Sequence, residues 1–166
     1  MFDLINGLPI HPLVVHAVVV LLPLACLGTL AIAVRPAWRE RYGVLVVACA
    51  AVATALVPFA TSSGEALEER VGDPGAHAEM GDQLIWFALP LLALSAILVW
   101  LDRRARSQGV HDAGSDAAGT RATGRHAINV VAALALVAAL AATVQVYRVG
   151  DSGARAAWGD QVVATR

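Results

Sequence analysis

Four long apolar runs divide the chain and restrict it to one kind of fold. They cover residues 13–34, 43–61, 83–101 and 127–146, and the first run holds no Asp, Glu, Lys or Arg. A helix of roughly 20 apolar residues crosses the hydrocarbon core of a bilayer. Unbroken runs of Leu, Val and Ala lack the alternation that a membrane β-barrel requires. We therefore expect an all-α, integral membrane four-helix bundle in which residues 1–166 form a single domain.

The composition agrees with a membrane protein and excludes other classes. Hydrophobic residues make up 58% of the chain and charged residues 15%, whereas soluble domains have about 45–50% and about 25%. The balance of 12 basic and 13 acidic residues lacks the excess of positive charge that nucleic-acid binding needs. The expected surroundings are therefore a lipid bilayer, with no nucleic-acid partner.

Arginine counts in the connections predict the orientation of the spans. The connections at residues 35–42 and 102–126 hold eight Arg, whereas the N-terminal segment, the 62–82 connection and the C-terminal tail hold four. Positive residues accumulate on the cytoplasmic side, so both termini are expected outside. All basic residues are Arg and none is Lys, which fits a GC-rich bacterial genome and hence the bacterial plasma membrane. Small polar residues at 107–124 predict a flexible cytoplasmic linker.

Ionisable residues gather on the side that is expected to be outside, and two histidines begin the first span there. Pro12 follows His11 and suits the first turn of a helix. His16 then lies about one turn inside the span, about 140° away from His11 around the helix. We expect His16 to face the bundle interior and His11 to face the surface. Ionisable residues within spans are commonly functional, although a neutral His16 could instead donate to a backbone carbonyl of a neighbouring helix.

A third histidine belongs to the connection before the third span. Asp73 is the expected N-cap and Pro74 the first residue of the third helix. His77 would then lie above the membrane, within reach of the first span, although a solvated interfacial His is the alternative. Ser62 to Glu65 is expected to close the second helix, which makes Glu65 the acidic residue nearest to the bundle.

The chain after the fourth span is expected to turn back. Gly150 permits a left-handed helix end, after which residues 151–158 would fold over the opening of the bundle. The sequence contains no phosphate-binding glycine loop, nucleophile elbow or HExxH motif. We therefore name no catalytic residue and expect no enzyme of a motif-defined class.

Four motifs in order resemble one bacterial family. They are His11-Pro-Leu-Val-Val-His16, Ser63-Gly-Glu-Ala-Leu-Glu-Glu-Arg-Val71, His77-Ala-Glu-Met-Gly-Asp82 and Val146-Tyr-Arg-Val-Gly-Asp-Ser-Gly-Ala154. Together they resemble the actinobacterial form of the "domain of unknown function 2231" membrane family. The resemblance implies a four-span membrane protein and supplies no activity. Some members carry a Rieske-type iron–sulfur domain on the same chain, which implies a redox context. Relatives often have His where this chain has Asp151, so a ligand at this position would here be a carboxylate.

Two functions remain open at this point. The first is a haem b or transition-metal site at the outer mouth of the bundle, serving electron transfer or metal handling with a redox partner or a membrane complex. Haem would use His16 and His77 from facing helices. A metal ion would draw its ligands from a His/carboxylate set: His11, His16, His77, Glu65, Glu79 and Asp151. The second function has no cofactor and is that of a structural or accessory subunit, or of a small proton-linked transporter. A homo-oligomer is compatible with either.

Overall fold

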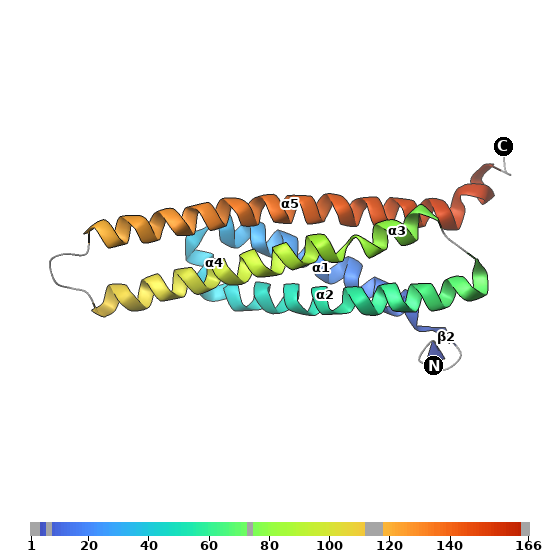
Figure 1. The fold of residues 1–166 in the computed structure, drawn as a ribbon, viewed down its shortest axis with the longest axis horizontal. Coiled ribbons are helices and arrows are strands. Elements are labelled where there is room, and N and C mark those ends of the chain that lie inside the picture. The colour runs from blue at the N-terminus through green and yellow to red at the C-terminus, as the bar shows by residue number, and fades with distance from the viewer. Residues whose placement is uncertain (1–3, 6–7, 73–74, 112–117, 164–166) are drawn as a thin grey trace.

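Four long helices and three short elements make up the part of the chain that the structure describes. The computed structural model describes residues 4–5, 8–72, 75–111 and 118–163. The long helices are α1 (Ile10–Val34), α2 (Pro36–Val71), α4 (Ile85–His111) and α5 (Ala118–Val163), and they lie side by side in one elongated bundle (Figure 1). The short elements are the antiparallel strands β1 (Leu4–Ile5) and β2 (Leu8–Pro9) and the helix α3 (Ala76–Asp82).

The lengths and outer surfaces of the helices confirm the expected membrane bundle. Four helical segments are long and apolar enough to cross a bilayer, and only 22–39% of the residues in their most apolar windows are buried inside the bundle. Large aliphatic side chains such as Leu24, Leu45, Leu89 and Val137 point outward. In water this surface would be costly, whereas in lipid it is matched to its surroundings.

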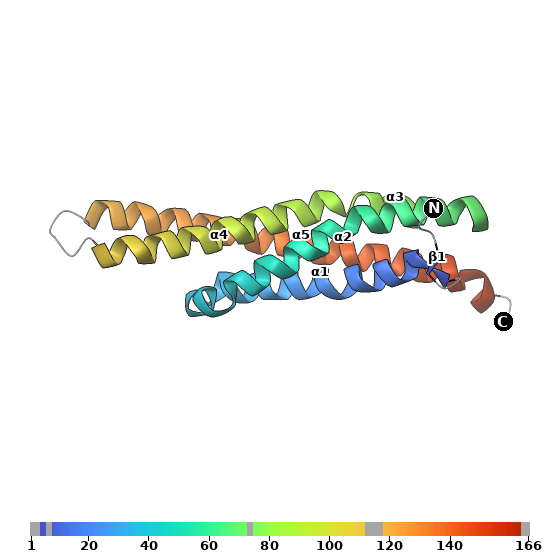
Figure 2. The ribbon, with the colours of Figure 1, turned by 90° about the horizontal axis from the view of Figure 1, so that it is seen from below.

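The helices form two hairpins that pack against each other. In the first hairpin α1 contacts α2, and in the second α4 contacts α5; between the hairpins, α1 packs on α5 and α2 on α4 (Figure 2). The second hairpin extends beyond the turn between α1 and α2 (Figure 1). Within the linker expected over 107–124, helix covers residues 107–111 and 118–124, and residues 112–117 lie outside the described residues.

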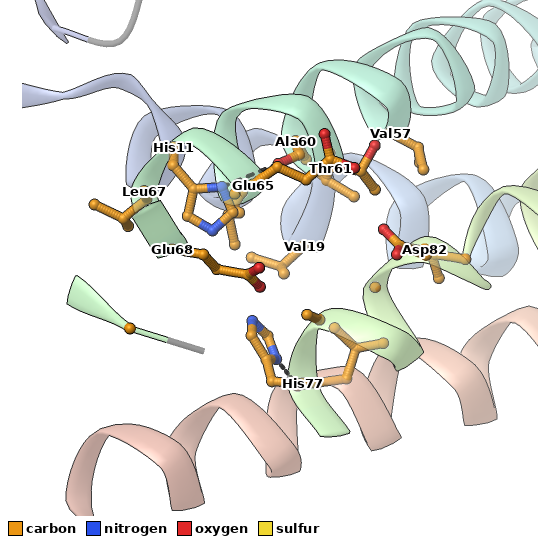
Figure 3. A pocket seen from close by; sticks show the side chains of 18 residues that line it. His11, Val19, Val57, Ala60, Thr61, Glu65, Leu67, Glu68, His77 and Asp82 are labelled. Carbon is orange, nitrogen blue, oxygen red and sulfur yellow. Dashed lines mark hydrogen bonds between the residues drawn. The ribbon is translucent and has the colours of Figure 1, made fainter. Parts of the chain in front are cut away.

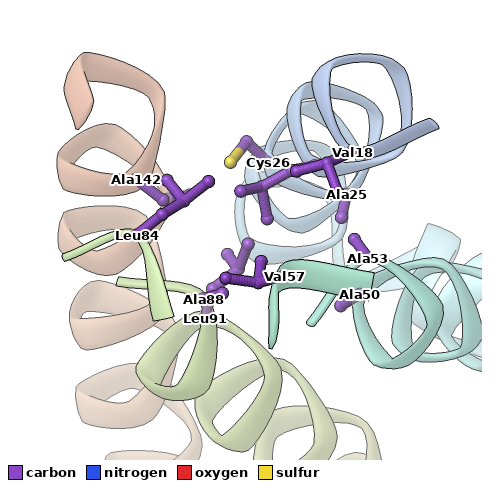
Figure 4. Close-up of a cluster of buried hydrophobic side chains, with 12 residues drawn as sticks. Val18, Ala25, Cys26, Ala50, Ala53, Val57, Leu84, Ala88, Leu91 and Ala142 are labelled. Atoms are coloured by element: carbon purple, nitrogen blue, oxygen red, sulfur yellow. The ribbon is translucent and has the colours of Figure 1, made fainter. Parts of the chain in front are cut away.

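Small residues let the helices approach closely in the core. Ala25, Ala50, Ala88 and Ala142 are fully buried, and they belong to one cluster with larger side chains such as Leu91 (Figure 4). Close backbone approach through small residues is the usual mode of helix association in membranes. This packing sets the relative positions of the helix ends that carry the histidines.

A buried arginine fastens the end of the bundle at the turn between α1 and α2, which we call the arginine end. Arg39 is only 4% exposed and donates to the carbonyls of Ile32 (2.7 Å) and Ala33 (2.9 Å), in the last turn of α1. Asp102 of α4 lies 3.6 Å from Arg39 and 2.8 Å from Arg106. Two of the carbonyls left unpaired at the α1 C-terminus thereby gain a donor, and the ion pair with Asp102 joins the two hairpins.

The opposite end, which holds His11 and His77, is called the histidine end and departs from two sequence expectations. Helix α2 does not close at Ser62–Glu65 but continues to Val71, and it ends at Gly72, whose φ of 96° suits glycine. Helix α5 passes through Gly150 without interruption, so residues 151–158 do not fold back. One glycine costs a helix only about 1 kcal/mol relative to alanine, which does not end a long, packed helix. Asp73 and Pro74, the expected helix start, lie outside the described residues, and α3 begins at Ala76.

Candidate functional site: a two-histidine cavity

A cavity of about 370 Å³ lies between the helices at the histidine end. Residues of α1, α2, α3 and α5 contribute to its wall, as does Leu84, just before α4. Much of this wall is aliphatic, and its ionisable side chains are His11, Glu65, Glu68, His77 and Asp82. Figure 3 shows His11 and His77 on opposite sides of the space, with Glu68 between them.

His11 is held by α2. It is the second residue of α1, and its side chain is half-buried rather than directed to the surface as expected. Its Nδ1 atom lies 3.0 Å from the carbonyl oxygen of Ala60 and 3.2 Å from Oγ of Ser63. The hydroxyl of Ser63 itself donates to the Ala60 carbonyl at 3.0 Å. The imidazole of His11 is therefore fixed by two groups one turn apart on α2.

His77 is held by α5 through the same kind of contact. It is the second residue of α3 and is half-buried. Its Nδ1 atom lies 3.2 Å from the carbonyl oxygen of Val149 and 3.3 Å from Oγ of Ser152, and Ser152 donates to Val149 at 2.9 Å. A second contact ties α3 to α5, because the buried Gln145 donates to the carbonyl of Met80 at 3.1 Å.

These contacts determine which ring nitrogen carries the proton. A backbone carbonyl only accepts hydrogen bonds, so Nδ1 of His11 and of His77 must be the donor. Each serine hydroxyl donates its own proton to the same carbonyl, so its oxygen accepts the hydrogen bond from Nδ1. In the neutral imidazole the lone pair then belongs to Nε2. Figure 3 shows these second nitrogens directed into the cavity from its two sides.

Two glycines make room for the imidazoles. Gly64 directly follows Ser63, and Gly153 directly follows Ser152. A Cβ atom on Gly64 would lie 3.1 Å from Cε1 of His11, and one on Gly153 would lie 2.9 Å from Cε1 of His77. Neither position can carry a side chain without moving the ring.

Acidic side chains surround the histidines. Glu68 is half-buried and interacts electrostatically with His11, while Glu65 and Asp82 are exposed at the edge of the cavity. No Arg is among the residues that line the described part of this cavity. The cavity therefore combines two imidazole Nε2 atoms with the carboxyl groups of three acidic side chains.

The expected orientation of His16 is wrong. Its side chain is exposed on the outside of α1, and its Nδ1 contacts the carbonyl of Pro12 in its own helix. The buried positions of α1 include Val18, Leu22 and Ala25, and the same stripe extended back by seven residues contains His11 and not His16. The two imidazoles do point in different directions, as their spacing requires, but the inward one is His11.

The other expected metal ligands are not brought together. Glu65 reaches the cavity wall with His11 and His77, whereas Glu79 and Asp151 are not among the wall residues. Asp151 instead pairs with Arg155 at 2.9 Å on the surface of α5. Within the part of the chain that the structure describes, no three His, Cys, Asp or Glu side chains lie close enough to hold a metal ion.

Sequence reasoning missed the residues that hold the imidazoles. In the sequence, Ser63 and Ser152 stand out only as parts of longer motifs, and the carbonyls of Ala60 and Val149 carry no signal. One signal was present: the dipeptide Ser-Gly occurs twice in the chain, at 63–64 and at 152–153. Its repetition near the end of the second and fourth long helices marks both imidazole-binding positions.

The family model described as "Predicted membrane protein (DUF2231)" matches residues 7–166. No curated protein and no solved structure matches the chain.

Proposed function

Because the chain belongs to the DUF2231 family, whose description states a membrane location and no activity, we propose a function from the site itself. The proposed function is that of a membrane electron-transfer protein that binds haem b, with His11 and His77 as the axial ligands. The observation that carries this proposal is the matched anchoring of the two imidazoles. Each Nδ1 is occupied by a carbonyl and a serine on a neighbouring helix, and each Nε2 is directed into one cavity (Figure 3).

The anchoring is what a metal-ligating histidine needs. Ligating imidazoles almost always donate their other N–H to a carbonyl, carboxylate or water, which fixes the tautomer and the ring orientation. His11 comes from α1 and His77 from α3, so two helices present one nitrogen each. Haem sites in helical bundles are built from facing helices in this way.

The donor set favours haem over a bare ion. Three or four protein ligands are typical of a bound transition-metal ion, and the described residues offer no such group. Haem brings four equatorial nitrogens of its own and needs only axial ligands from the protein. Its apolar ring also suits the aliphatic wall formed by Val15, Val19, Leu67 and Leu84. When bound, the iron would supply one-electron chemistry between its ferric and ferrous forms.

Glu68 favours a second candidate. Its carboxylate lies between the two imidazoles (Figure 3), and a small closure of the helices would give a set of two His and one carboxylate. Such sets hold zinc or non-haem iron. If the chain bound one such ion and no haem, the function at these residues would be metal handling and not electron transfer through haem.

The expected orientation extends the proposal to location and partner. If the Arg-rich connections face the cytoplasm of a bacterial cell, the cavity opens on the outer side of the plasma membrane. Electrons would then be exchanged with a redox protein or a membrane complex on that side. The acidic mouth formed by Glu65, Glu68 and Asp82 would attract a partner with a positively charged surface.

The test is the haem content of the detergent-purified protein, expressed with a haem supply. We expect about one haem per chain and the reduced-minus-oxidised spectrum of a bis-imidazole haem. His11→Ala and His77→Ala should each abolish this spectrum, whereas His16→Ala, the matched control on the outside of α1, should retain it.

Each other result has a defined meaning. Folded wild-type protein that binds neither haem nor a metal ion would refute the proposal and leave an accessory or transport bundle. One zinc, copper or iron ion per chain without haem, lost in Glu68→Gln, would establish the second candidate. Loss of haem in His16→Ala with retention in His11→Ala would contradict the ligand assignment.

A further inference from the structure

The two halves of the chain repeat one structural unit. Each half is a helical hairpin that begins with a histidine as the second residue of its first helix, His11 in α1 and His77 in α3. A proline follows each histidine inside the hairpin's first long helix, Pro23 after 12 residues and Pro90 after 13. The interval with the additional residue includes the break between α3 and α4.

The second helix of each hairpin repeats the same features. Helix α2 carries Ser63-Gly64 near its end, and α5 carries Ser152-Gly153. In both halves the serine lies three residues after the carbonyl that accepts from the histidine. The glycine that follows leaves room for the ring in both.

Packing between the halves follows the same relationship. In this repeat α1 corresponds to α4, and α2 corresponds to α5. The contact between α1 and α5 then corresponds to the contact between α4 and α2, and both contacts exist. The long helices are therefore arranged as an approximate two-fold repeat. The two imidazoles occupy corresponding places and face a single cavity.

We propose that Ser63 and Ser152 are equivalent positioning residues, each of which holds one imidazole with its Nδ1 protonated and its Nε2 presented to the cavity. The serine hydroxyl is itself fixed, because it donates to the carbonyl three residues before it. It therefore offers its oxygen to Nδ1 in one direction. Carbonyl, hydroxyl and imidazole form a closed triangle of hydrogen bonds. Without the hydroxyl the ring keeps only the carbonyl as a partner of Nδ1 and is less strongly held against rotation.

The first test needs no cofactor. Nitrogen-15 NMR of labelled, detergent-solubilised protein distinguishes protonated from unprotonated ring nitrogens. We expect His11 and His77 with Nδ1 protonated in the wild type. Ser63→Ala should move the His11 signals toward a mixture of tautomers and leave His77 unchanged, and Ser152→Ala should do the reverse. Ser62→Ala, at the exposed neighbouring position, should change neither, and Ser63→Thr and Ser152→Thr should retain the wild-type signals.

The second test rests on the proposed haem function. Loss of the group that orients a ligating imidazole typically lowers metal affinity by about 10- to 100-fold, and we expect this loss in Ser63→Ala and Ser152→Ala with recovery in the threonine variants. Protein that binds no haem but shows the expected tautomer changes would refute the haem function and retain the positioning role. Protein that binds haem with unchanged affinity and unchanged tautomers in both alanine variants would overturn the positioning role alone.

Discussion

A Cβ atom on Gly153 would lie 2.9 Å from Cε1 of His77, closer than carbon atoms approach in folded proteins. Gly64 and His11 stand in the same relationship at 3.1 Å. Neither glycine has a positive φ, so backbone conformation does not explain its presence. The close approach does, because it brings each imidazole near enough to reach a carbonyl one turn earlier on the adjacent helix.

Gly64→Ala and Gly153→Ala should each displace one imidazole. Alanine is the better helix former by about 1 kcal/mol, but the inserted methyl group must push the ring away, which typically costs about 1–3 kcal/mol. We expect a lower thermal midpoint in detergent, altered nitrogen-15 signals of the adjacent histidine, and a reduced haem content.

Gly150→Ala is the matched control for this test. Gly150 lies one turn before Gly153 in α5, and a Cβ atom there would meet nothing within 4 Å. This variant should keep the wild-type signals and melt at an equal or higher temperature. If Gly153→Ala behaved in the same way, the close approach would not determine the position of His77.

Effects of different size are expected from replacing the two histidines of α1 by leucine. His16→Leu removes an exposed polar ring that contacts only its own helix among the described interactions, and the change should alter the free energy of unfolding by less than about 1 kcal/mol. His11→Leu removes two hydrogen bonds to α2 and should cost about 1–3 kcal/mol. Denaturation from mixed detergent micelles measures both, and equal losses would contradict the inward placement of His11.

Arg39 should be the most important cation for stability at the arginine end. Arg39→Met removes two hydrogen bonds to the α1 C-terminus and one of the two cations beside Asp102. We expect a loss of about 2–4 kcal/mol in the free energy of unfolding. Arg106→Met also removes a partner of Asp102, but Arg106 is half-exposed, and its loss should cost at most about 1 kcal/mol. A larger effect for Arg106 would show that the exposed pair, and not the buried one, joins the hairpins.

The four spans follow from the sequence because membrane insertion depends on the length and polarity of a run, and both are visible along the chain. The rotation of α1 about its axis is less visible. Leu13, Val20, Leu24 and Leu27 face outward, so the lipid-facing side is as apolar as the core and no amphipathic contrast marks the inside. For this reason the sequence wrongly predicts that His16 faces the bundle interior. Small residues such as Ala25 mark the buried stripe, and tracing it back leads to His11.

The helix ends were harder to predict for a related reason. Gly150 permits a helix end, and the polar residues around Ser63 are typical of one, yet α2 and α5 continue past both. Turn chemistry describes what a local segment tolerates, whereas these segments also contact His11 and His77 in the folded bundle. Such contacts depend on residues more than 50 positions away in the chain and so escape local reasoning.

The side of the membrane on which the cavity opens is a prediction that two cysteines can test. Glu79 is exposed at the histidine end and Ser107 at the arginine end of the α3–α4 segment. In a chain whose own thiols are removed by Cys26→Ala and Cys49→Ala, Glu79→Cys should react with a membrane-impermeant maleimide in intact cells. Ser107→Cys should react only after the cells are permeabilised, since its connection is rich in Arg.

The outcome decides which partners the two-histidine cavity can meet. Labelling of Glu79→Cys alone would leave the mouth formed by Glu65, Glu68 and Asp82 open to the cell exterior, where a positively charged electron donor or acceptor would have to dock. Labelling of Ser107→Cys alone would reverse the bundle and direct the search to cytoplasmic partners. Because the control after permeabilisation must label both positions, a poorly expressed variant or an unreactive cysteine cannot imitate either result.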